Sequence, residues 1–391
     1  MKNTTNIQLA SHDTCTGCAA CVSVCSKGCI TMREDRGGFL QPHIDADTCI
    51  ECHKCEKTCP ILKPIEIPTD CETIAYASIN KDDKVRAQSS SGGMFYALAK
   101  WTIEQGGVVF GARYNEWMEV VHDYTETIEG INPFMRSKYV QSRIGDTFKQ
   151  AKQFLKQNRW VLYVGTPCQI GGLLAFVGKK CDKLLTVDFI CHGVPGPGVW
   201  KRYLAESFNG DEILTFNFRD KSEGWTPNQC IVTTTTSSTT IRTLLMENAY
   251  FRGFRNDIYL RNSCYDCRFR EYHRSSDFTI ADYWGVQENC PEMFDNKGTS
   301  IVFVHSKKAE GIFNSIKPTL RVEKQEKDLA IAGNRGMDSM NPVKQPVKRN
   351  IFYALLKRYT FPSTVRVMDT VVMADRYLNK IPRKIRKLVK R

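Results

Sequence analysis

Helical and strand-like spacings of hydrophobic residues alternate along the middle of the chain. Residues 89–107, SSSGGMFYALAKWTIEQGG, open on serines, continue through an apolar helical stretch and stop at a glycine pair, which predicts a helix. The apolar run at 108–114 predicts a buried strand, and residues 119–125 are its expected hairpin partner. A second helix is expected over 144–158, IGDTFKQAKQFLKQN. The pattern indicates a mixed α and β fold.

Two further apolar runs each end in a cysteine. Residues 160–169 read WVLYVGTPCQ, and residues 184–193 read LLTVDFICHG. Strand, helix and strand in this order predict a parallel sheet. From about residue 210 the pattern changes to strands, first ILTFNFRD and then QCIVTTTTSSTTIRTLL. The second stretch predicts a hairpin, because β-branched threonines suit exposed strand faces.

The N-terminus carries two four-cysteine runs of identical spacing, C-x2-C-x2-C-x3-C, and the second ends in Cys-Pro. This is the pattern of bacterial two-cluster ferredoxins, in which the fourth cysteine of each run ligates the cluster of the other. We therefore predict two 4Fe–4S clusters. The ligands of the first are Cys15, Cys18, Cys21 and Cys59, and those of the second are Cys25, Cys49, Cys52 and Cys55.

Disulfides and zinc are the alternatives for such cysteine runs. Residues 1–10 have neither a charged n-region nor a long apolar stretch, which disfavours a secreted, disulfide-bonded domain. Zinc sites usually have separate C-x2-C pairs instead of two matching runs of four. Two details depart from the ferredoxin pattern: Cys25 precedes Ser26 instead of a proline, and Cys29 is an additional thiol without an assigned role. Residues 60–70, with three prolines, predict a linker.

The chain is too long to be a ferredoxin alone. Its 391 residues leave room for two or three domains, and 42% hydrophobic residues can bury a sizeable core. No apolar stretch approaches the ~20 residues of a membrane-spanning helix. Seventeen cysteines without a signal peptide predict a reducing, cytoplasmic location.

The net charge of +13 is concentrated at the C-terminus. Residues 342–391 carry fourteen Lys and Arg against two acidic residues, a net +12, so the rest of the chain is near neutral. No nucleic-acid partner is expected, since no recognition motif accompanies the tail. The last residues, IPRKIRKLVKR, fit peripheral contact with an anionic membrane or an acidic electron-transfer partner, and equally a solvated cationic helix.

Four more cysteines occupy positions where ligands gather. Cys168 and Cys191 each follow an apolar run, and ligands of open α/β sheets lie outside the carboxyl ends of the strands. Cys264 and Cys267 form a single C-x2-C, which is compatible with zinc, a redox dithiol or chance. The residues alone leave open a third four-thiolate site or, for Cys168 and Cys191, small buried hydrophobic side chains.

Several separated motifs resemble the coenzyme F420 hydrogenase/dehydrogenase beta-subunit family. They are SKYVQS, VGTPCQIGGL, DFICHGVPGPGVW and SCYDCRFREYHRSSDFTIADYWG, and the resemblance covers roughly residues 75–335. With its fused ferredoxin, the chain resembles the F420H2 dehydrogenase input subunit and the front half of F420-dependent sulfite reductase. The resemblance implies an FAD and a third 4Fe–4S cluster with Cys168, Cys191, Cys264 and Cys267 as ligands. The remaining cysteines, Cys71, Cys181, Cys230 and Cys290, are expected to be structural.

The expected fold is α+β and multidomain: a bacterial-type dicluster ferredoxin, an α/β flavin domain with a mixed sheet, and a basic helical C-terminal tail. The ferredoxin unit takes residues 1–70. The N-terminal and C-terminal parts of the family domain take 71–185 and 186–335, and the tail takes 336–391.

No G-x-G-x-x-G or G-x4-G-K-[ST] motif occurs, so the flavin phosphates need another site. The serines and glycines before the first predicted helix offer free backbone N–H groups and the positive end of the helix dipole. The resemblance implies FAD there; without it, an N-cap with a flexible entry loop is the preferred interpretation. The candidate cofactor-binding residues are Ser90, Ser91, Gly92, Gly93, Lys138, Tyr139, Gly165, Thr166, Gln169 and His192. Asp282 and Trp284 are expected to organise the site, and no catalytic residue is assigned.

Two functions follow. The first is an iron–sulfur flavoprotein oxidoreductase that passes electrons between the ferredoxin clusters, the third cluster and FAD to reduce or oxidise an organic substrate, coenzyme F420 or another small molecule. Its partner would be a redox protein or a small-molecule electron donor or acceptor. The second is a non-catalytic subunit that delivers electrons to a partner enzyme. The fold does not identify the substrate.

Overall fold

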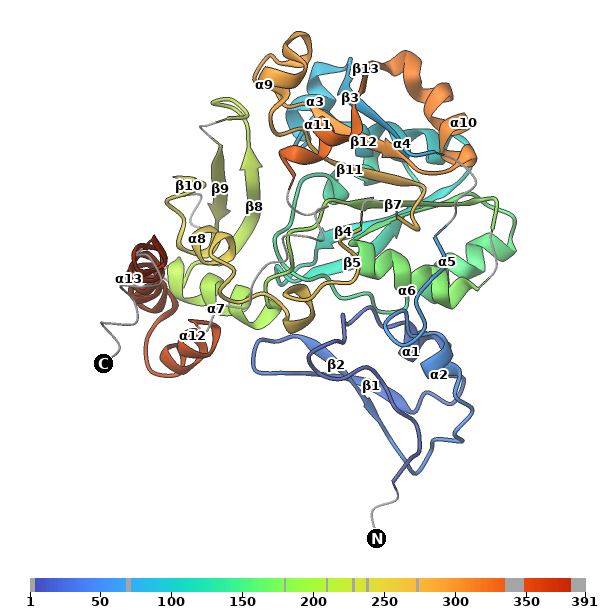
Figure 1. Cartoon of the computed structure of the whole chain (residues 1–391), viewed down its shortest axis with the longest axis vertical. Coiled ribbons are helices and arrows are strands. Elements are labelled where there is room, and N and C mark those ends of the chain that lie inside the picture. The colour runs from blue at the N-terminus through green and yellow to red at the C-terminus, as the bar shows by residue number, and fades with distance from the viewer. Residues whose placement is uncertain are drawn as a thin grey trace.

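The computed structural model describes residues 4–67, 72–178, 181–208, 210–226, 229–236, 239–271, 274–334 and 348–380, without the side chains after Ala374. Three parts are visible in Figure 1. The cysteine-rich N-terminal unit lies at one end, an eight-stranded sheet with its helices at the other, and a three-stranded sheet with four helices to one side.

The N-terminal unit repeats one local structure twice. Each cysteine run turns into a short helix, α1 (Ala20–Val24) or α2 (Lys54–Lys57), and the hairpin of β1 (Ile30–Glu34) and β2 (Leu40–Ile44) lies between them in sequence. Gly17 and Ala19 in the first run have φ of 69° and 60°, and Glu51 and His53 at the equivalent places have 52° and 57°. The matching left-handed turns wrap the backbone around each group of thiols in the same way.

The large sheet has the order β13-β3-β12-β11-β7-β6-β4-β5. Its four central strands, β11, β7, β6 and β4, run parallel, and the outer pairings are antiparallel. The strands are β3 (Ile74–Asn80), β4 (Val108–Tyr114), β5 (Val120–Thr125), β6 (Val161–Gly165), β7 (Leu184–Phe189), β11 (Phe278–Asp282), β12 (Ser300–Val304) and β13 (Leu320–Gln325). Both predicted family segments thus contribute strands to one sheet.

Alternate residues of the central strands face two different cores. Leu162 and Leu185 pack with α4 (Met94–Glu104) and α10 (Lys307–Ile316) on one face. Val161 and Tyr163 pack with α5 (Thr147–Lys156) and α6 (Pro167–Val177) on the other. Ala20 of α1 belongs to this second core, so the N-terminal unit docks on the α5/α6 face. The remaining short helices of this region are α3 (Asp83–Gln88), α9 (Val286–Asn289), α11 (Lys327–Ala332), η1 (Glu129–Phe134), η2 (Asn262–Cys264), η3 (Pro291–Met293) and η4 (Lys317–Thr319).

The third part combines a small sheet with the C-terminal helices. Strands β8 (Ile213–Asp220), β9 (Cys230–Thr235) and β10 (Thr240–Leu244) are antiparallel. An aromatic core joins them to α7 (Pro197–Ser207), α8 (Ala249–Arg255), α12 (Lys348–Leu356) and α13 (Phe361–Lys380). Phe352, Phe361 and Val365 are fully buried in this core. Residues 348–374 of the basic tail are therefore a packed part of the fold, and residues 335–347 and 381–391 lie outside the described chain.

Glycines allow the N-terminal unit to approach the main body closely. The N–H of Gly198, at the start of α7, donates to the carbonyl of Gly37 over 3.0 Å, and a Cβ on Gly38 would lie 2.2 Å from the Gly198 nitrogen. Gly38 also has a φ of +76°. An ion pair of 2.5 Å between Arg143 and Glu34 adds a polar contact. The cysteine runs are thereby held in a fixed position against the larger domain.

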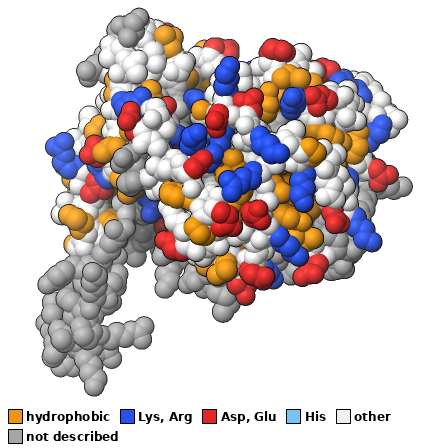
Figure 2. All heavy atoms as spheres, turned by 90° about the horizontal axis from the view of Figure 1, so that it is seen from above, with side chains coloured by type: hydrophobic (Ala, Val, Ile, Leu, Met, Phe, Trp, Pro, Cys, Tyr) orange, Lys and Arg blue, Asp and Glu red, His pale blue; other side chains and the backbone are white. Residues whose placement is uncertain are grey.

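The predicted elements are present. The expected helices correspond to α4 and α5, the first hairpin to β4 and β5, and the threonine-rich hairpin to β9 and β10. The α+β multidomain fold class is confirmed. Among the described residues, no helix combines the length and the apolar character needed to cross a membrane. Figure 2 shows acidic and basic side chains interspersed on one face of the body.

His122 on β5 should make stability depend on pH. Burial lowers its pKa from 6.5 to about 4, and Nε2 contacts the carbonyl of Val164 at 3.0 Å. The folded state therefore holds the ring neutral while the unfolded chain binds a proton below its ordinary pKa, so stability falls as pH falls. Between about pH 7 and about pH 5.5 the loss should be about 1 kcal/mol. Thermal unfolding of His122→Gln should show a correspondingly weaker pH dependence; an unchanged dependence would contradict the assignment.

Candidate functional site: three cysteine groups and a cationic loop region

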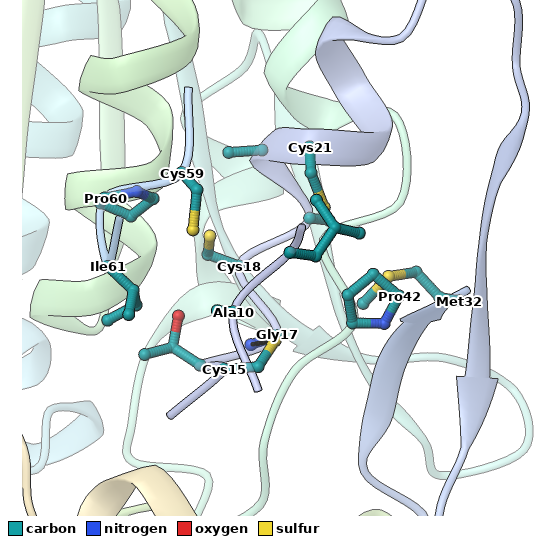
Figure 3. A pocket seen from close by; sticks show the side chains of 14 residues that line it. Ala10, Cys15, Gly17, Cys18, Cys21, Met32, Pro42, Cys59, Pro60 and Ile61 are labelled. Carbon is teal, nitrogen blue, oxygen red and sulfur yellow. Dashed lines mark hydrogen bonds between the residues drawn. The ribbon is translucent and has the colours of Figure 1, made fainter. Parts of the chain in front are cut away.

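The first cysteine group is Cys15, Cys18, Cys21 and Cys59, which together line one cavity (Figure 3). The fourth member comes from the second run, as the crossed arrangement of ferredoxin ligands requires. Apolar side chains, among them Leu9, Ile61 and Pro60, form much of the remaining wall. The set of donors is four thiols, which suits iron–sulfur ligation.

Burial and crowding raise the pKa of two of these thiols, Cys18 and Cys21. Burial raises the pKa of Cys18 to about 12, and Cys15 and Cys168 contribute to the same shift. The pKa of Cys21 is raised by burial and by Cys18, Cys15 and Cys59. Because thiolates are the ligands, cationic iron would have to supply the missing favourable charge. The number of thiols around this one cavity fits the four ligands of a 4Fe–4S cluster.

The second cysteine group contains one more thiol than predicted. Cys29 Sγ lies 3.4 Å from Cys25 Sγ, and burial, Cys25 and Cys49 together raise the pKa of Cys29 to about 12. Burial, with Cys49 as a weaker cause, also raises the pKa of Cys55. Cys52 is the exposed member of this group. The sequence identified Cys29 as a surplus thiol, and only the fold places it beside the predicted ligands.

We expect Cys29→Ala to retain all of the iron of the two ferredoxin clusters, because the repeated backbone turns present Cys49, Cys52 and Cys55 together and Cys25 as the fourth thiol. Cys25→Ala is the matched variant and should lower the iron of this unit by up to about four atoms. Iron and acid-labile sulfide measured after anaerobic purification test both. A loss of about four irons in Cys29→Ala would show that Cys29, not Cys25, is the ligand.

The third cysteine group assembles from three separate segments. Cys168 is the second residue of α6, directly after β6; Cys191 follows the adjacent parallel strand β7; Cys264 and Cys267 lie at and after η2. A Cβ on Gly193 would lie 3.3 Å from the Cβ of Cys264, so the Cys-His-Gly turn packs on the C-x2-C segment. Burial, and then Cys267, raises the pKa of Cys168 to about 12 and that of Cys264 to about 11. The pKa of Cys191 is raised by burial, Cys264, Cys168 and Cys267.

The third group lies next to the first. Cys168 contributes to the raised pKa of Cys18, and a Cβ on Gly172 of α6 would lie 2.8 Å from Cys18 Sγ. The cysteines therefore form a continuous series: the second group with exposed Cys52, the first group against α6, and the third group at the strand ends. Residue spacing could not reveal this order, because it depends on how the two domains dock.

The Ser-Gly segment lies against the SKYVQS segment. Ser90 Oγ contacts Ser137 Oγ at 3.0 Å and accepts the Ser137 N–H at 2.8 Å. Ser91 Oγ donates to the carbonyl of Thr299. The Gly92 N–H donates to Ser300 Oγ, so this group is not free as expected. Gly93, with φ of 91°, begins α4 without a side-chain cap. The structure thus brings two of the predicted flavin segments together.

Cationic side chains surround this junction. The Lys138 Nζ donates to the carbonyl of Met135 at 2.7 Å, and the Lys221 Nζ donates to that of Ser91 at 2.9 Å. Burial, with Arg136 as a neighbour, lowers the pKa of Lys138 to about 7. Burial, with Arg86 as the next cause, lowers the pKa of Lys221 to about 7. A bound anion would favour the protonated form of both side chains.

Arg219 was not predicted and lies beside the same region. Its buried guanidinium donates from Nη1 to Tyr139 Oη at 2.9 Å and to Asp282 Oδ2 at 2.8 Å. Nε and Nη2 of Arg219 and Oδ1 of Asp282 are buried without a hydrogen-bond partner in the described protein. Trp284 lies under the guanidinium and stacks on Trp225 with ring centroids 4.9 Å apart. Orphaned buried polar atoms of this kind fit a polar ligand.

The other predicted flavin contacts have protein partners. Thr166 and Gln169 form a reciprocal capping box at the start of α6, and Gln169 also donates to Ser142 Oγ at 3.0 Å. His192 Nε2 contacts Asp257 Oδ1 at 2.6 Å. These residues, with Gly165, lie around the third cysteine group, and their contact with a flavin stays a prediction.

Residues 158–329 match the family model for the C terminus of the coenzyme F420 hydrogenase/dehydrogenase beta subunit, and residues 14–61 match a 4Fe–4S dicluster domain. Residues 158–329 therefore belong to this C-terminal family. Together with the dicluster match, they indicate an iron–sulfur protein related to the F420 hydrogenase beta subunit. Ferredoxin 7Fe of Hydrogenibacillus schlegelii is 46% identical over 43 residues, which are 11% of this chain and 49% of that protein. The chain spans about half the length of this curated relative.

A chain of the F420-reducing [NiFe] hydrogenase complex from Methanosarcina barkeri, solved after xenon derivatization, also resembles this one. The match has a TM-score of 0.46 and 14% identity, and covers 70% of this chain and 92% of that chain.

Proposed function

We propose that this beta-subunit-type protein is an iron–sulfur flavoprotein oxidoreductase. It would pass electrons between two ferredoxin-type clusters, a third 4Fe–4S cluster and FAD, and so reduce or oxidise an organic substrate, coenzyme F420 or another small molecule. The observation that carries the proposal is the series of three cysteine groups, which leads from exposed Cys52 to thiols at the ends of the central strands.

The third group favours a metal cluster over isolated buried cysteines. Four thiols from three segments converge, and neighbouring thiols contribute to the raised pKa of Cys168, Cys191 and Cys264. Arg261 and Arg270 offset part of the rise that burial causes in the pKa of Cys264, and bound iron would have to supply the rest of the favourable charge. Cys168, Cys191, Cys264 and Cys267 would hold the cluster. Ligands commonly lie outside the carboxyl ends of parallel strands.

The Ser-Gly segment and its cations would hold FAD. Bound FAD accepts two electrons as hydride and exchanges them singly, which links organic substrates to iron–sulfur clusters. Bound phosphates would favour the protonated forms of Lys138 and Lys221. Two nitrogen atoms of Arg219, Nε and Nη2, are available to donate to an oxygen or nitrogen acceptor. Tyr139 contributes an edge-on ring among Phe218 and Phe251 and holds Arg219 through its hydroxyl group.

A non-catalytic subunit that delivers electrons to a partner enzyme is the second candidate. It is favoured by the family's description as a beta subunit and by the exposed Cys52 and Ile50, where a redox partner could approach the second cysteine group. Contact of the basic tail with an acidic partner or an anionic membrane is a proposal about residues 381–391, which lie outside the described chain.

Anaerobic purification followed by iron, sulfide and flavin determination separates the two candidates. About twelve irons and one FAD per chain are expected for the flavoenzyme. About eight irons without flavin would leave only the ferredoxin-type electron carrier. Bleaching of the visible spectrum by reduced F420, compared with other hydride donors, then tests the substrate.

A further inference from the structure

Arg261 is a buried cation in contact with the first cysteine group and near the third. The side chain is 1% exposed. Its Nε donates to the carbonyl of Cys15 at 2.7 Å, and its Nη2 approaches Cys15 Sγ at 3.7 Å. Only two residues separate it from Cys264, whose N–H donates to the Arg261 carbonyl at 2.9 Å. Cys168 and Cys264 both experience its charge.

No acidic side chain of the described residues pairs with this guanidinium. Its other acceptors are Gln141 Oε1 at 3.0 Å and the carbonyl of Leu40 at 2.9 Å, and Phe39 lies under its plane. By contrast, the buried arginines at 86 and 219 each pair with an aspartate. A buried charge without a counter-ion costs several kcal/mol. The thiolates and sulfides of a cluster at the first cysteine group would supply the missing negative charge.

The surrounding backbone is shaped to admit the guanidinium. A Cβ on Gly17 would lie 2.7 Å from Arg261 Nη1, and Gly17 has a φ of +69°. Gln141 accepts from Arg261 and donates from Nε2 to the Thr16 carbonyl at 2.9 Å. The contacts hold one positive charge between the two thiol groups instead of letting it turn to solvent.

We infer that Arg261 sets the reduction potentials of the clusters at the first and third cysteine groups together. A four-thiolate cluster gains one negative charge on reduction, and a nearby fixed cation favours the reduced form, so it raises the potential. The effect should be largest at the first group, which Arg261 touches, smaller at the third, and absent at the second. The third-group part rests on the proposed function.

The test is a redox titration, monitored by EPR, of anaerobically purified holoprotein. In Arg261→Gln the ratio of reduced to oxidised first cluster at a fixed potential should fall by about tenfold or more. The third cluster should shift less in the same direction, while the second cluster serves as an internal reference. Arg261→Lys should recover part of the shift. Arg202→Gln, which removes an arginine of α7 paired with Glu206, controls for general destabilisation and should shift nothing.

Gln141→Glu is the second variant, because it leaves Arg261 in place and puts a carboxylate at the Gln141 Oε1 position, 3.0 Å from Nη1. Gln141→Glu should lower the reduction potentials of the first and third clusters. If Arg261→Gln loses iron, Gln141→Glu by itself tests the inference. Unchanged potentials in an iron-complete variant, or an equal shift of all three clusters, would overturn the inference. About eight irons in the wild-type protein would instead overturn the proposed function, and with it the third-group half.

Discussion

Cys264→Ala is expected to lower the iron content from about twelve to about eight atoms per chain while the ferredoxin clusters remain. Cys264 lies near Cys191 and Cys267, and its removal leaves three thiols from three segments to hold the third cluster. Clusters of this type take four protein ligands. Reduction of bound flavin through the ferredoxin clusters should then stop. Iron, sulfide and stopped-flow flavin spectra measure the loss.

Cys181→Ala is the matched control, because Cys181 contributes only to the core on the α5/α6 face and belongs to none of the three groups. It should keep all of its iron. A Cys264→Ala protein with about twelve irons would contradict the ligand assignment. An intact iron content together with lost flavin reduction would instead separate electron transfer from iron binding.

Gly92→Ala should deplete FAD and destabilise the fold by about 1–3 kcal/mol or more. A Cβ at this position would lie 2.2 Å from the Ser78 carbonyl and 2.7 Å from the Ser300 nitrogen, and both are backbone atoms that cannot turn away. The segment would have to withdraw from β3 and β12, and it would carry Ser90 and the start of α4 with it. Flavin quantified per iron, with the thermal midpoint, tests this result.

Gly311→Ala is the control for Gly92→Ala. Gly311 lies within α10, and a Cβ there meets nothing within 4 Å. Replacing it should stabilise the helix by up to about 1 kcal/mol and leave the flavin content unchanged. If Gly92→Ala bound FAD as well as the wild type, the Ser-Gly segment would not be the phosphate site.

The two cofactor proposals rest on different kinds of structural support. The cysteine groups bring together thiols from separate segments, and clustered thiols suit few ligands other than metals. The Ser-Gly segment satisfies several of its own polar groups, as the bond from Gly92 N–H to Ser300 shows. Its support comes instead from the surrounding charge of Lys138 and Lys221 and from the unpaired atoms of Arg219 and Asp282. Loss of FAD in an Arg219 variant would therefore be informative.

The sequence by itself determined what depends on short separations along the chain. The spacing of the cysteine runs predicts the ferredoxin unit, and crossing the runs places Cys59 with Cys15, as observed. The spacing of hydrophobic residues predicts α4, α5 and the hairpins. This is possible because each element shows its apolar face in its own short stretch of sequence. Chain order likewise places Cys168 and Cys191 at neighbouring strand ends.

Only the tertiary structure decided which distant residues meet. Arg219 beside Tyr139 and Arg261 beside Cys15 are 80 and 246 positions apart in the chain. The sequence also did not predict that α12 and α13 pack into the aromatic core. The basic residues of the tail dominate its composition, and the sequence does not show which surface its apolar residues contact. Long-range contacts depend on how the domains dock and on how buried charges are compensated. The spacing of residues along the chain predicts neither.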